Sequence, residues 1–308
     1  MAYDFTVENG KLLYCDGGGA TLTVPKGVRR LDSMCFSGVE AKRIILPEGL
    51  RTIAEEAFHW LDELVSVSLP STLRTIGTGA FYGCKKLRRI DIPEGVSRIG
   101  EAAFSECRSL THVTLPSTLT SIGVDAFHGC TSLRAIVIPA GVKSIKVGTF
   151  ENCNALSRIT LPEGVRVIEA KAFSGCDRLK SVRLPKSLQG LGWRAFAHCY
   201  LLEKIALPAG VEYIDHEAFF GCANLMAAAL PGSVKKLGIG IFDGTGTGKG
   251  IPDRDDIFVK EGEVKEEPAS AFVLYAPLGS PAEAYAKENA LAFCPKGRML
   301  KKQEETKK

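Results

Sequence analysis

The sequence has no long apolar run, no CxxC pair and little net charge, and each absence excludes a class of protein. No window approaches the ~18 consecutive apolar residues of a membrane-spanning helix, so no membrane span is predicted. The 39 Lys and Arg against 35 Asp and Glu leave a formal charge of +4, which is too small an excess to indicate a nucleic-acid partner. A hydrophobic content of 45% excludes a disordered chain.

A secretory signal is also lacking at the N-terminus. The segment MAYDFTVENG has no apolar stretch behind a basic start. We therefore expect a cytoplasmic protein as the sequence is written. The alternative is a surface or secreted protein whose signal has been trimmed away.

Proline, in contrast, is present at one fixed interval. Its recurrence every 23 residues indicates an internal repeat, which is the strongest signal in the sequence. Pro25 precedes the regular series by 22 residues, and the series itself occupies positions 47, 70, 93, 116, 139, 162, 185, 208 and 231.

Other columns of the repeat keep the same phase as the prolines. Phenylalanine follows each proline by eleven residues, from Phe36 to Phe242, and cysteine follows by fourteen, from Cys84 to Cys222. Leucine and other aliphatic residues fill further columns, which gives the unit LxxIxLPxxLxxIGxxAFxGCxx. One such unit cannot bury its apolar side chains alone, whereas stacked copies place like residues on like.

The predicted fold is therefore a repeat solenoid of about ten turns, capped at both ends. The run before each proline, such as 87–92, alternates apolar and polar residues as a half-buried strand does. A second short extended stretch follows, and the AFxGC segment is expected to form a tight or 3-10 turn that carries phenylalanine inward. Short parallel strands should thus stack in register along the solenoid.

This unit closely resembles the BspA-type leucine-rich repeats, the proline-containing class with 23 residues per turn. The resemblance covers roughly residues 20–243. It implies that the LxxIxL strands line a concave face, and that the protein binds other proteins or acts in bacterial adhesion rather than in catalysis. The terminal segment SPAEAYAKENALAF also resembles the cap that follows such repeats.

The two ends of the chain differ from the repeat and predict its domain limits. An Asn9-Gly10 turn between two extended segments indicates a hairpin cap over 1–22. The solenoid then covers 23–243, followed by a linker over 244–256. A C-terminal cap is expected over 257–295, with a helix opened by a capping box at Ser280–Glu283, and a disordered tail over 296–308.

Three patterns in the sequence could indicate a chemical site. The glycine-rich stretch 244–250 lacks the glycine and the Ser or Thr that a phosphate loop requires. His128 lies two residues from Cys130, but the cysteine column should point into the core, which disfavours a nucleophile pair. Buried thiols are the favoured interpretation of that column, and disulfides or a redox role remain alternatives. No catalytic residue, metal or other cofactor is predicted.

The outward positions of the strands are the candidate binding residues. They lie two and four residues before each proline, and their side chains are mixed and mildly basic in the middle of the array. The predicted partner-binding residues are Arg89, Asp91, His112, Thr114, Arg158, Thr160, Arg183 and Lys204.

A second basic stripe lies four residues after the proline and includes Arg29, Arg51 and Arg74. A solubilising lattice of ion pairs is its favoured interpretation, and steering of an acidic partner is the alternative. The sequence as a whole predicts a monomeric, non-enzymatic scaffold that binds a protein of unknown identity. A surface or secreted adhesin that binds host or extracellular proteins is the alternative.

Overall fold

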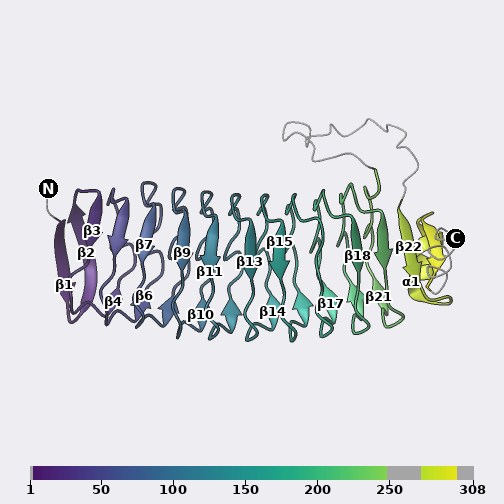
Figure 1. Ribbon diagram of the computed structural model, residues 1–308, viewed down its shortest axis with the longest axis horizontal. Coiled ribbons are helices and arrows are strands. Elements are labelled where there is room, and N and C mark those ends of the chain that lie inside the picture. The colour runs from purple at the N-terminus through teal and green to yellow at the C-terminus, as the bar shows by residue number, and fades with distance from the viewer. Residues whose placement is uncertain (1–2, 248–271, 297–308) are drawn as a thin grey trace, which may run out of the picture.

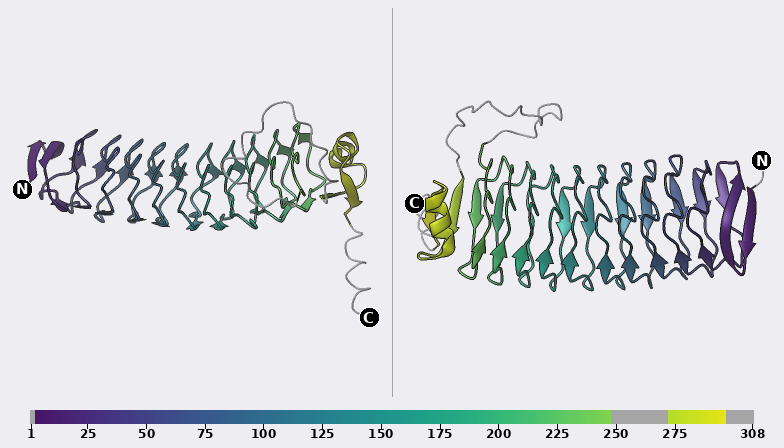
Figure 2. Two further views of the ribbon diagram at one scale, coloured as in Figure 1. Left: turned by 90° about the horizontal axis from the view of Figure 1, so that it is seen from above. Right: turned by 180° about the vertical axis from the view of Figure 1, so that it is seen from behind.

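The protein is an elongated stack of short strands, with the N-terminal hairpin at one end and the only helix of the described residues at the other (Figure 1). The computed structural model describes residues 3–247 and 272–296. The stack is a β-solenoid of about eleven turns with parallel strands. Its curvature is slight in the view from above, so the strand face expected to be concave is close to flat (Figure 2).

One side of the solenoid, the long-strand sheet, consists of strands that precede the prolines. Its ladder is interrupted after β11 and again after β15, where segment 181–183 forms no strand. The sheet runs in the order β3 (Thr21–Thr23), β5 (Arg43–Ile45), β7 (Ser66–Ser68), β9 (Arg89–Asp91), β11 (His112–Thr114), then β13 (Ala135–Val137), β15 (Arg158–Thr160), then β18 (Lys204–Ala206), β20 (Ala227–Ala229), β22 (Val273–Ala276), β23 (Ala292–Pro295).

A second side, the short-strand sheet, consists mainly of two-residue strands that follow the prolines. From β2 onward each strand pairs in parallel and in register with the strand of the next turn, as Arg98 does with Thr75 and Ser121, except that the ladder is interrupted between β12 and β14. Its order is β1 (Tyr3–Glu8), β2 (Lys11–Gly17), β4 (Arg30–Leu31), β6 (Thr52–Ile53), β8 (Thr75–Ile76), β10 (Arg98–Ile99), β12 (Ser121–Ile122), then β14 (Ser144–Ile145), β16 (Val167–Ile168), β17 (Gly190–Leu191), β19 (Tyr213–Ile214), β21 (Lys236–Leu237).

The third side, the turn face, is built from the AFxGC segments. Here each turn donates backbone hydrogen bonds to the next, for example from the Phe104 N–H to the Ala126 carbonyl at 2.8 Å. The segment needs positive φ at two positions per turn, such as Asp125 at 52° and Gly129 at 66°. Positive φ suits glycine, which explains why glycine recurs in these columns, although several turns place other residues there.

Phenylalanine forms the centre of the core. From Phe58 to Phe242 the rings of successive turns stack, with centroids 4.5–5.6 Å apart. The first nine members, Phe36 to Phe219, are fully buried. The predicted inward position of this column is therefore confirmed.

The cysteine column is buried as free thiols, so the disulfide alternative is wrong for the described cysteines. Each thiol donates to the carbonyl of a phenylalanine 26 residues earlier, as Cys130 does to Phe104 at 3.2 Å. Burial raises the pKa of Cys84 to about 12 and that of Cys107 well above its usual range. A protonated, buried thiol is a poor nucleophile, so this column has a structural role.

Both ends of the described solenoid are covered. The antiparallel hairpin β1–β2 pairs with β4, and at the other end β22 extends the long-strand sheet beside β20. Helix α1 (Pro281–Glu288) lies beyond it, and its Tyr285 hydroxyl accepts a 3.0 Å hydrogen bond from the Ile241 N–H. None of the described helices is long and apolar enough to cross a membrane.

The capping box predicted at Ser280 is wrong in detail. The Ser280 hydroxyl donates to the Pro277 carbonyl at 2.6 Å instead of capping the helix, and Glu283 accepts from the Gly279 N–H at 2.7 Å. Most of the predicted linker, residues 257–271 of the predicted C-terminal cap and all of the tail except residue 296 lie outside the described residues. The domain limits given above stay a prediction.

Candidate binding surface

The exposed side of the long-strand sheet carries the predicted binding residues. In each three-residue strand the central side chain points inward, and the outer two point toward solvent. In β9, for example, Ile90 is 1% exposed while Arg89 and Asp91 are exposed. All eight predicted residues have exposed side chains.

Four of the eight residues form one polar network across β9 and β11. Arg89 donates twice to Asp91, at 2.7 and 3.1 Å, and the Thr114 hydroxyl donates to the same carboxylate at 2.7 Å. His112 Nε2 lies 3.3 Å from that hydroxyl. The Arg89 guanidinium lowers the pKa of the Asp91 carboxyl by direct hydrogen bonding. We refer to Arg89, Asp91, His112 and Thr114 as the polar quartet.

An open groove of about 600 Å³ adjoins this quartet where the ladder is interrupted between β11 and β13. His112 and Thr114 line one wall, and Ala135 and Val137 line the other. The Val137 side chain is 66% exposed, and Val137 is not among the eight predicted binding residues. The groove thus combines polar groups with uncovered apolar surface.

The other four predicted residues are more scattered. Thr160 and Arg183 line a small groove of about 150 Å³, at the place where segment 181–183 replaces a strand. Arg158 lies on β15 beside Ala135 of β13, and Lys204 lies on β18 beside Ala227 of β20. Of the eight predicted residues, four therefore form one connected network and the other four lie apart from it.

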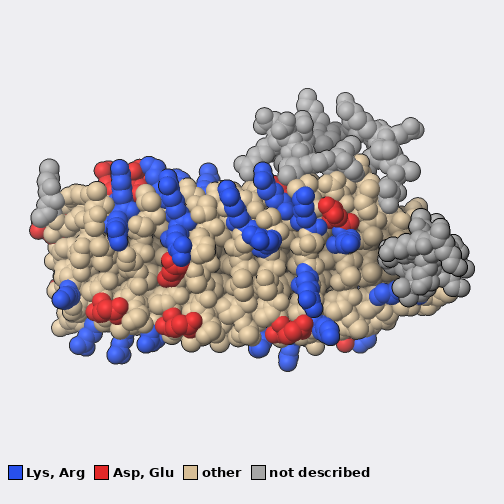
Figure 3. All heavy atoms as spheres, viewed as in Figure 1, with Lys and Arg blue, Asp and Glu red and all other residues tan. Residues whose placement is uncertain are grey.

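Charge on the visible face is predominantly positive (Figure 3). In the stripe four residues after the proline, Lys235 pairs with Glu212 at 3.2 Å. Arg74 and Lys143 instead donate to carbonyls of their own turns. Within the described residues Lys235 is the only member of the stripe with an ion pair, so the predicted ion-pair lattice is wrong for most of it.

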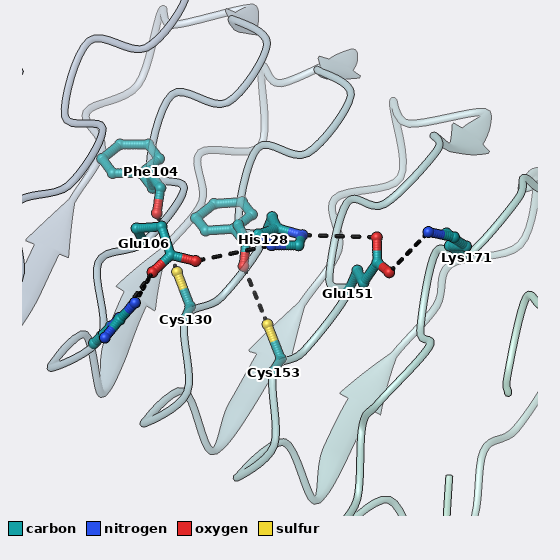
Figure 4. Close-up of polar contacts among 9 residues, drawn as sticks. Phe104, Glu106, His128, Cys130, Glu151, Cys153 and Lys171 are labelled. Atoms are coloured by element: carbon teal, nitrogen blue, oxygen red, sulfur yellow. Dashed lines mark hydrogen bonds and ion pairs between the residues drawn. The ribbon is translucent and has the colours of Figure 1, made fainter. Parts of the chain in front are cut away.

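A second polar group, on the turn face, was missed by the sequence analysis. Figure 4 shows Glu106, His128 and Glu151 in a row, with His128 facing Glu151 and the Cys130 thiol directed at the Phe104 carbonyl instead. Because the thiol is engaged elsewhere, no His128–Cys130 nucleophile pair exists. The available signal was that His128 and Glu151 occupy the same column one turn apart.

Comparison with known proteins supports the reading of the repeat. The model of the BspA type leucine-rich repeat region matches six copies, over residues 19–134 and 144–249. No curated protein matches the sequence.

Several solved bacterial structures are also similar. A leucine-rich repeat protein from Bacteroides ovatus is 21% identical, with 96% of this chain and 97% of that chain covered and a TM-score of 0.40. A leucine rich cell surface protein from Faecalibacterium prausnitzii is 22% identical, with coverages of 94% and 96% and a TM-score of 0.44. A leucine-rich repeat protein from Eubacterium ventriosum is 20% identical, with coverages of 79% and 68% and a TM-score of 0.48. The family model covers well over half of the sequence, and the chain belongs to the BspA-type leucine-rich repeat family.

Proposed function

We propose that the protein is a non-enzymatic scaffold that binds a protein partner through the exposed side of the long-strand sheet. The observation that carries this proposal is the polar quartet beside the groove at β11–β13. The groove offers uncovered apolar surface at Val137 within reach of His112 and Thr114. A mixed surface of this kind can supply both buried area and oriented hydrogen bonds to a partner.

Rigidity of the sheet supports the same proposal. The quartet residues are on strands paired in register, His112 with Arg89 and Thr114 with Asp91. Their backbone positions are therefore fixed, and hydrogen bonds to Asp91 hold the Arg89 and Thr114 side chains before a partner arrives, which lowers the entropy cost of binding. The exposed basic residues of this sheet favour a partner with an acidic surface; they include Arg89, Arg158, Arg183 and Lys204.

Charge reversal on this sheet tests the proposal by affinity capture from lysate of the source cells. Arg89→Glu/Arg158→Glu/Arg183→Glu should lose the partner without losing the fold, because exposed substitutions usually change stability little. The matched control is Arg30→Glu/Arg98→Glu/Lys236→Glu, three exposed reversals on the short-strand sheet.

A protein captured by wild type and by the control, but not by the first variant, would support the proposal. If both variants captured the same proteins as wild type, the long-strand sheet would not be the binding surface. Cytoplasmic location remains a prediction, with surface or secreted location as its alternative.

A further inference from the structure

The turn face carries a group of side chains with the composition of a metal site. Asp125, His128 and Glu151 each offer one ligand atom, and these atoms all lie within 4.8 Å of one another. Asp125 and His128 come from one turn and Glu151 from the next. All three side chains are partly buried. We propose that Asp125, His128 and Glu151 bind a divalent transition-metal ion such as Zn²⁺.

The separation between His128 and Glu151 is longer than a direct hydrogen bond. His128 Nδ1 lies 3.7 Å from Glu151 Oε2, whereas an N–H···O hydrogen bond is about 2.7–3.2 Å long. Two atoms that each lie about 2.0–2.2 Å from one Zn²⁺ are separated by about 3–4 Å. The imidazole and the carboxylate are thus spaced as ligands of a shared ion.

Neighbouring cations orient the carboxylates. Lys171 Nζ lies 3.3 Å from Glu151 Oε1, which leaves Oε2 directed at His128 (Figure 4). On the other side Arg108 pairs with Glu106 Oε2 at 2.7 Å, and Glu106 Oε1 lies 3.8 Å from His128 Nε2. When Nδ1 binds metal, Nε2–H can donate to Glu106, which is the outer carboxylate that metal-bound histidines commonly have.

Glycine provides the space for the ligands. A Cβ at Gly148 would lie 1.8 Å from Asp125 Oδ1 and 3.5 Å from Glu151 Oε2, so both carboxylates converge over this residue. Gly148 has a φ of 58°, and Ala102 occupies the same column with a φ of 48°. Alanine is therefore compatible with the backbone here but would displace the Asp125 carboxylate.

The donor set selects the type of ion. One imidazole nitrogen and two carboxylate oxygens suit Zn²⁺ and similar ions better than Mg²⁺ or Ca²⁺, which prefer oxygen alone. Three protein ligands leave at least one coordination position open. This site is on the turn face, away from the long-strand sheet. The metal-site proposal is therefore independent of the proposed protein-binding function.

Calorimetric titration of the metal-free full chain with Zn²⁺ alone tests the site. We expect one ion per chain and an affinity at least tenfold weaker in His128→Gln, in Glu151→Gln and in Gly148→Ala. Gly79→Ala is the matched control, because Gly79 has a φ of 55° in the same column and its added Cβ would meet only Glu56 Cγ, at 3.2 Å, and Tyr82 Cβ. It should bind Zn²⁺ as wild type does. Mg²⁺ should give no comparable heat.

Cobalt provides a second readout that excludes the cysteines. Co²⁺ at the proposed site should show ligand-field bands without a thiolate-to-cobalt charge-transfer band, and His128→Gln should lose them. The proposal is overturned if wild type takes up no ion or if Gly148→Ala binds as tightly as Gly79→Ala. A thiolate charge-transfer band would also overturn it.

Discussion

The residues of the phenylalanine column are chemically identical, but their surroundings change along the stack. Phe127 stacks between Phe104 and Phe150, with interplanar angles of 6° and 3°. Phe36 and Phe58, at the N-terminal end, are tilted by 36°. A central phenylalanine thus has a ring on each side, and its removal leaves a cavity that two neighbouring turns must line.

Phe127→Ala should lower the free energy of unfolding by about 3–5 kcal/mol, because it removes a fully buried ring from the middle of the column. Chemical denaturation followed by circular dichroism would measure this change. The control is Phe220→Ala, in the neighbouring column. Because the Phe220 side chain is only partly buried, this substitution should lower the free energy of unfolding much less. Equal losses for the two variants would contradict the packing argument.

Thiol reactivity should divide the cysteines into two classes. Nine are buried, and burial raises the pKa of Cys15 to about 11 and that of Cys35 to about 12, so both remain protonated near neutral pH. Only Cys294 is partly exposed. Brief alkylation of the native protein, read by peptide mass spectrometry, should label Cys294 alone, whereas the denatured chain should be labelled throughout. Rapid labelling of Cys130 in the native protein would show that the core opens more readily than its packing implies.

Neighbouring turns approach one another closely where glycine stacks on glycine, at the ends of the short strands. A Cβ on Gly100 would lie 2.4 Å from the carbonyl carbon of Gly77, and one on Gly123 would lie 2.4 Å from the Gly100 carbonyl oxygen. In both cases the nearest atoms are backbone atoms of the preceding turn, so no flexible side chain can move aside. Spacing between these turns therefore depends on the absence of side chains.

Gly100→Ala should destabilise the protein, by roughly 1–3 kcal/mol as for other overpacked sites, since β8 and β10 must separate to admit a methyl group. Gly18→Ala provides the control, because Gly18 lacks a positive φ and has no atom within 4 Å of the added Cβ. Thermal melting of the two variants would distinguish them. A melting temperature for Gly100→Ala equal to that of Gly18→Ala would mean that the turns can separate freely.

The Arg89–Asp91 interaction in the polar quartet should contribute to folding stability in a pH-dependent way. Arg89 lowers the pKa of Asp91 in the folded state, so the stabilisation is present above the unfolded value of about 3.9 and is lost as pH falls through the folded value. Arg89→Gln should therefore raise the Asp91 pKa, which an NMR titration of its carboxyl carbon would detect. Arg158→Gln, on β15, should leave it unchanged. The interaction would be refuted if both variants titrated like wild type.

Along the whole molecule, each turn contacts mainly the turns before and after it, through ladders that repeat every 23 residues. Stability of such an array is approximately a sum over turns and their interfaces. Removal of one complete repeat should shorten the rod without altering the contacts on either side. Removal of part of a repeat should misalign every column beyond the cut.

Deletion of residues 139–161, which is one repeat of 23 residues, should therefore yield a folded protein with a cooperative melt. Deletion of 139–149 removes the short strand β14 and joins the end of β13 directly to the AFxGC segment. It should yield an unfolded or aggregated chain, because every later column is then displaced by eleven residues from its partner in the preceding turn. Size-exclusion chromatography with circular dichroism compares the two. Folding of the shorter deletion would contradict the register argument.

Much of this architecture could be predicted from the sequence because the same residue recurs at each position. The inward direction of Phe127 and the strand containing Ile90 follow directly from periodicity. The loss of a strand at 181–183 and the gap between β11 and β13 could not be predicted, since both segments retain the repeat pattern. These departures depend on how whole turns pack against each other, and the residue types at the repeat positions do not indicate that packing.

The candidate sites were predictable to different extents. Exposure of Arg89 and Asp91 followed from alternation along the strand, but their hydrogen bonding to each other and to Thr114 depends on side-chain rotamers. The approach of Asp125 to Glu151 brings together side chains of two successive turns, and Asp125 has a left-handed φ of 52° that its own residue type does not indicate. The repeat pattern indicates that these polar side chains face outward, but it does not indicate which of them lie close enough to interact.

The buried thiols have a consequence for the lifetime of the folded protein. Ten cysteines without a disulfide are harmless while the solenoid is closed. Once a molecule unfolds in air, these thiols can oxidise in many combinations, and few of the products can refold into a stack of identical turns. Durability under oxidising conditions is therefore governed by the height of the unfolding barrier rather than by equilibrium stability, and a reducing agent should make heat denaturation reversible.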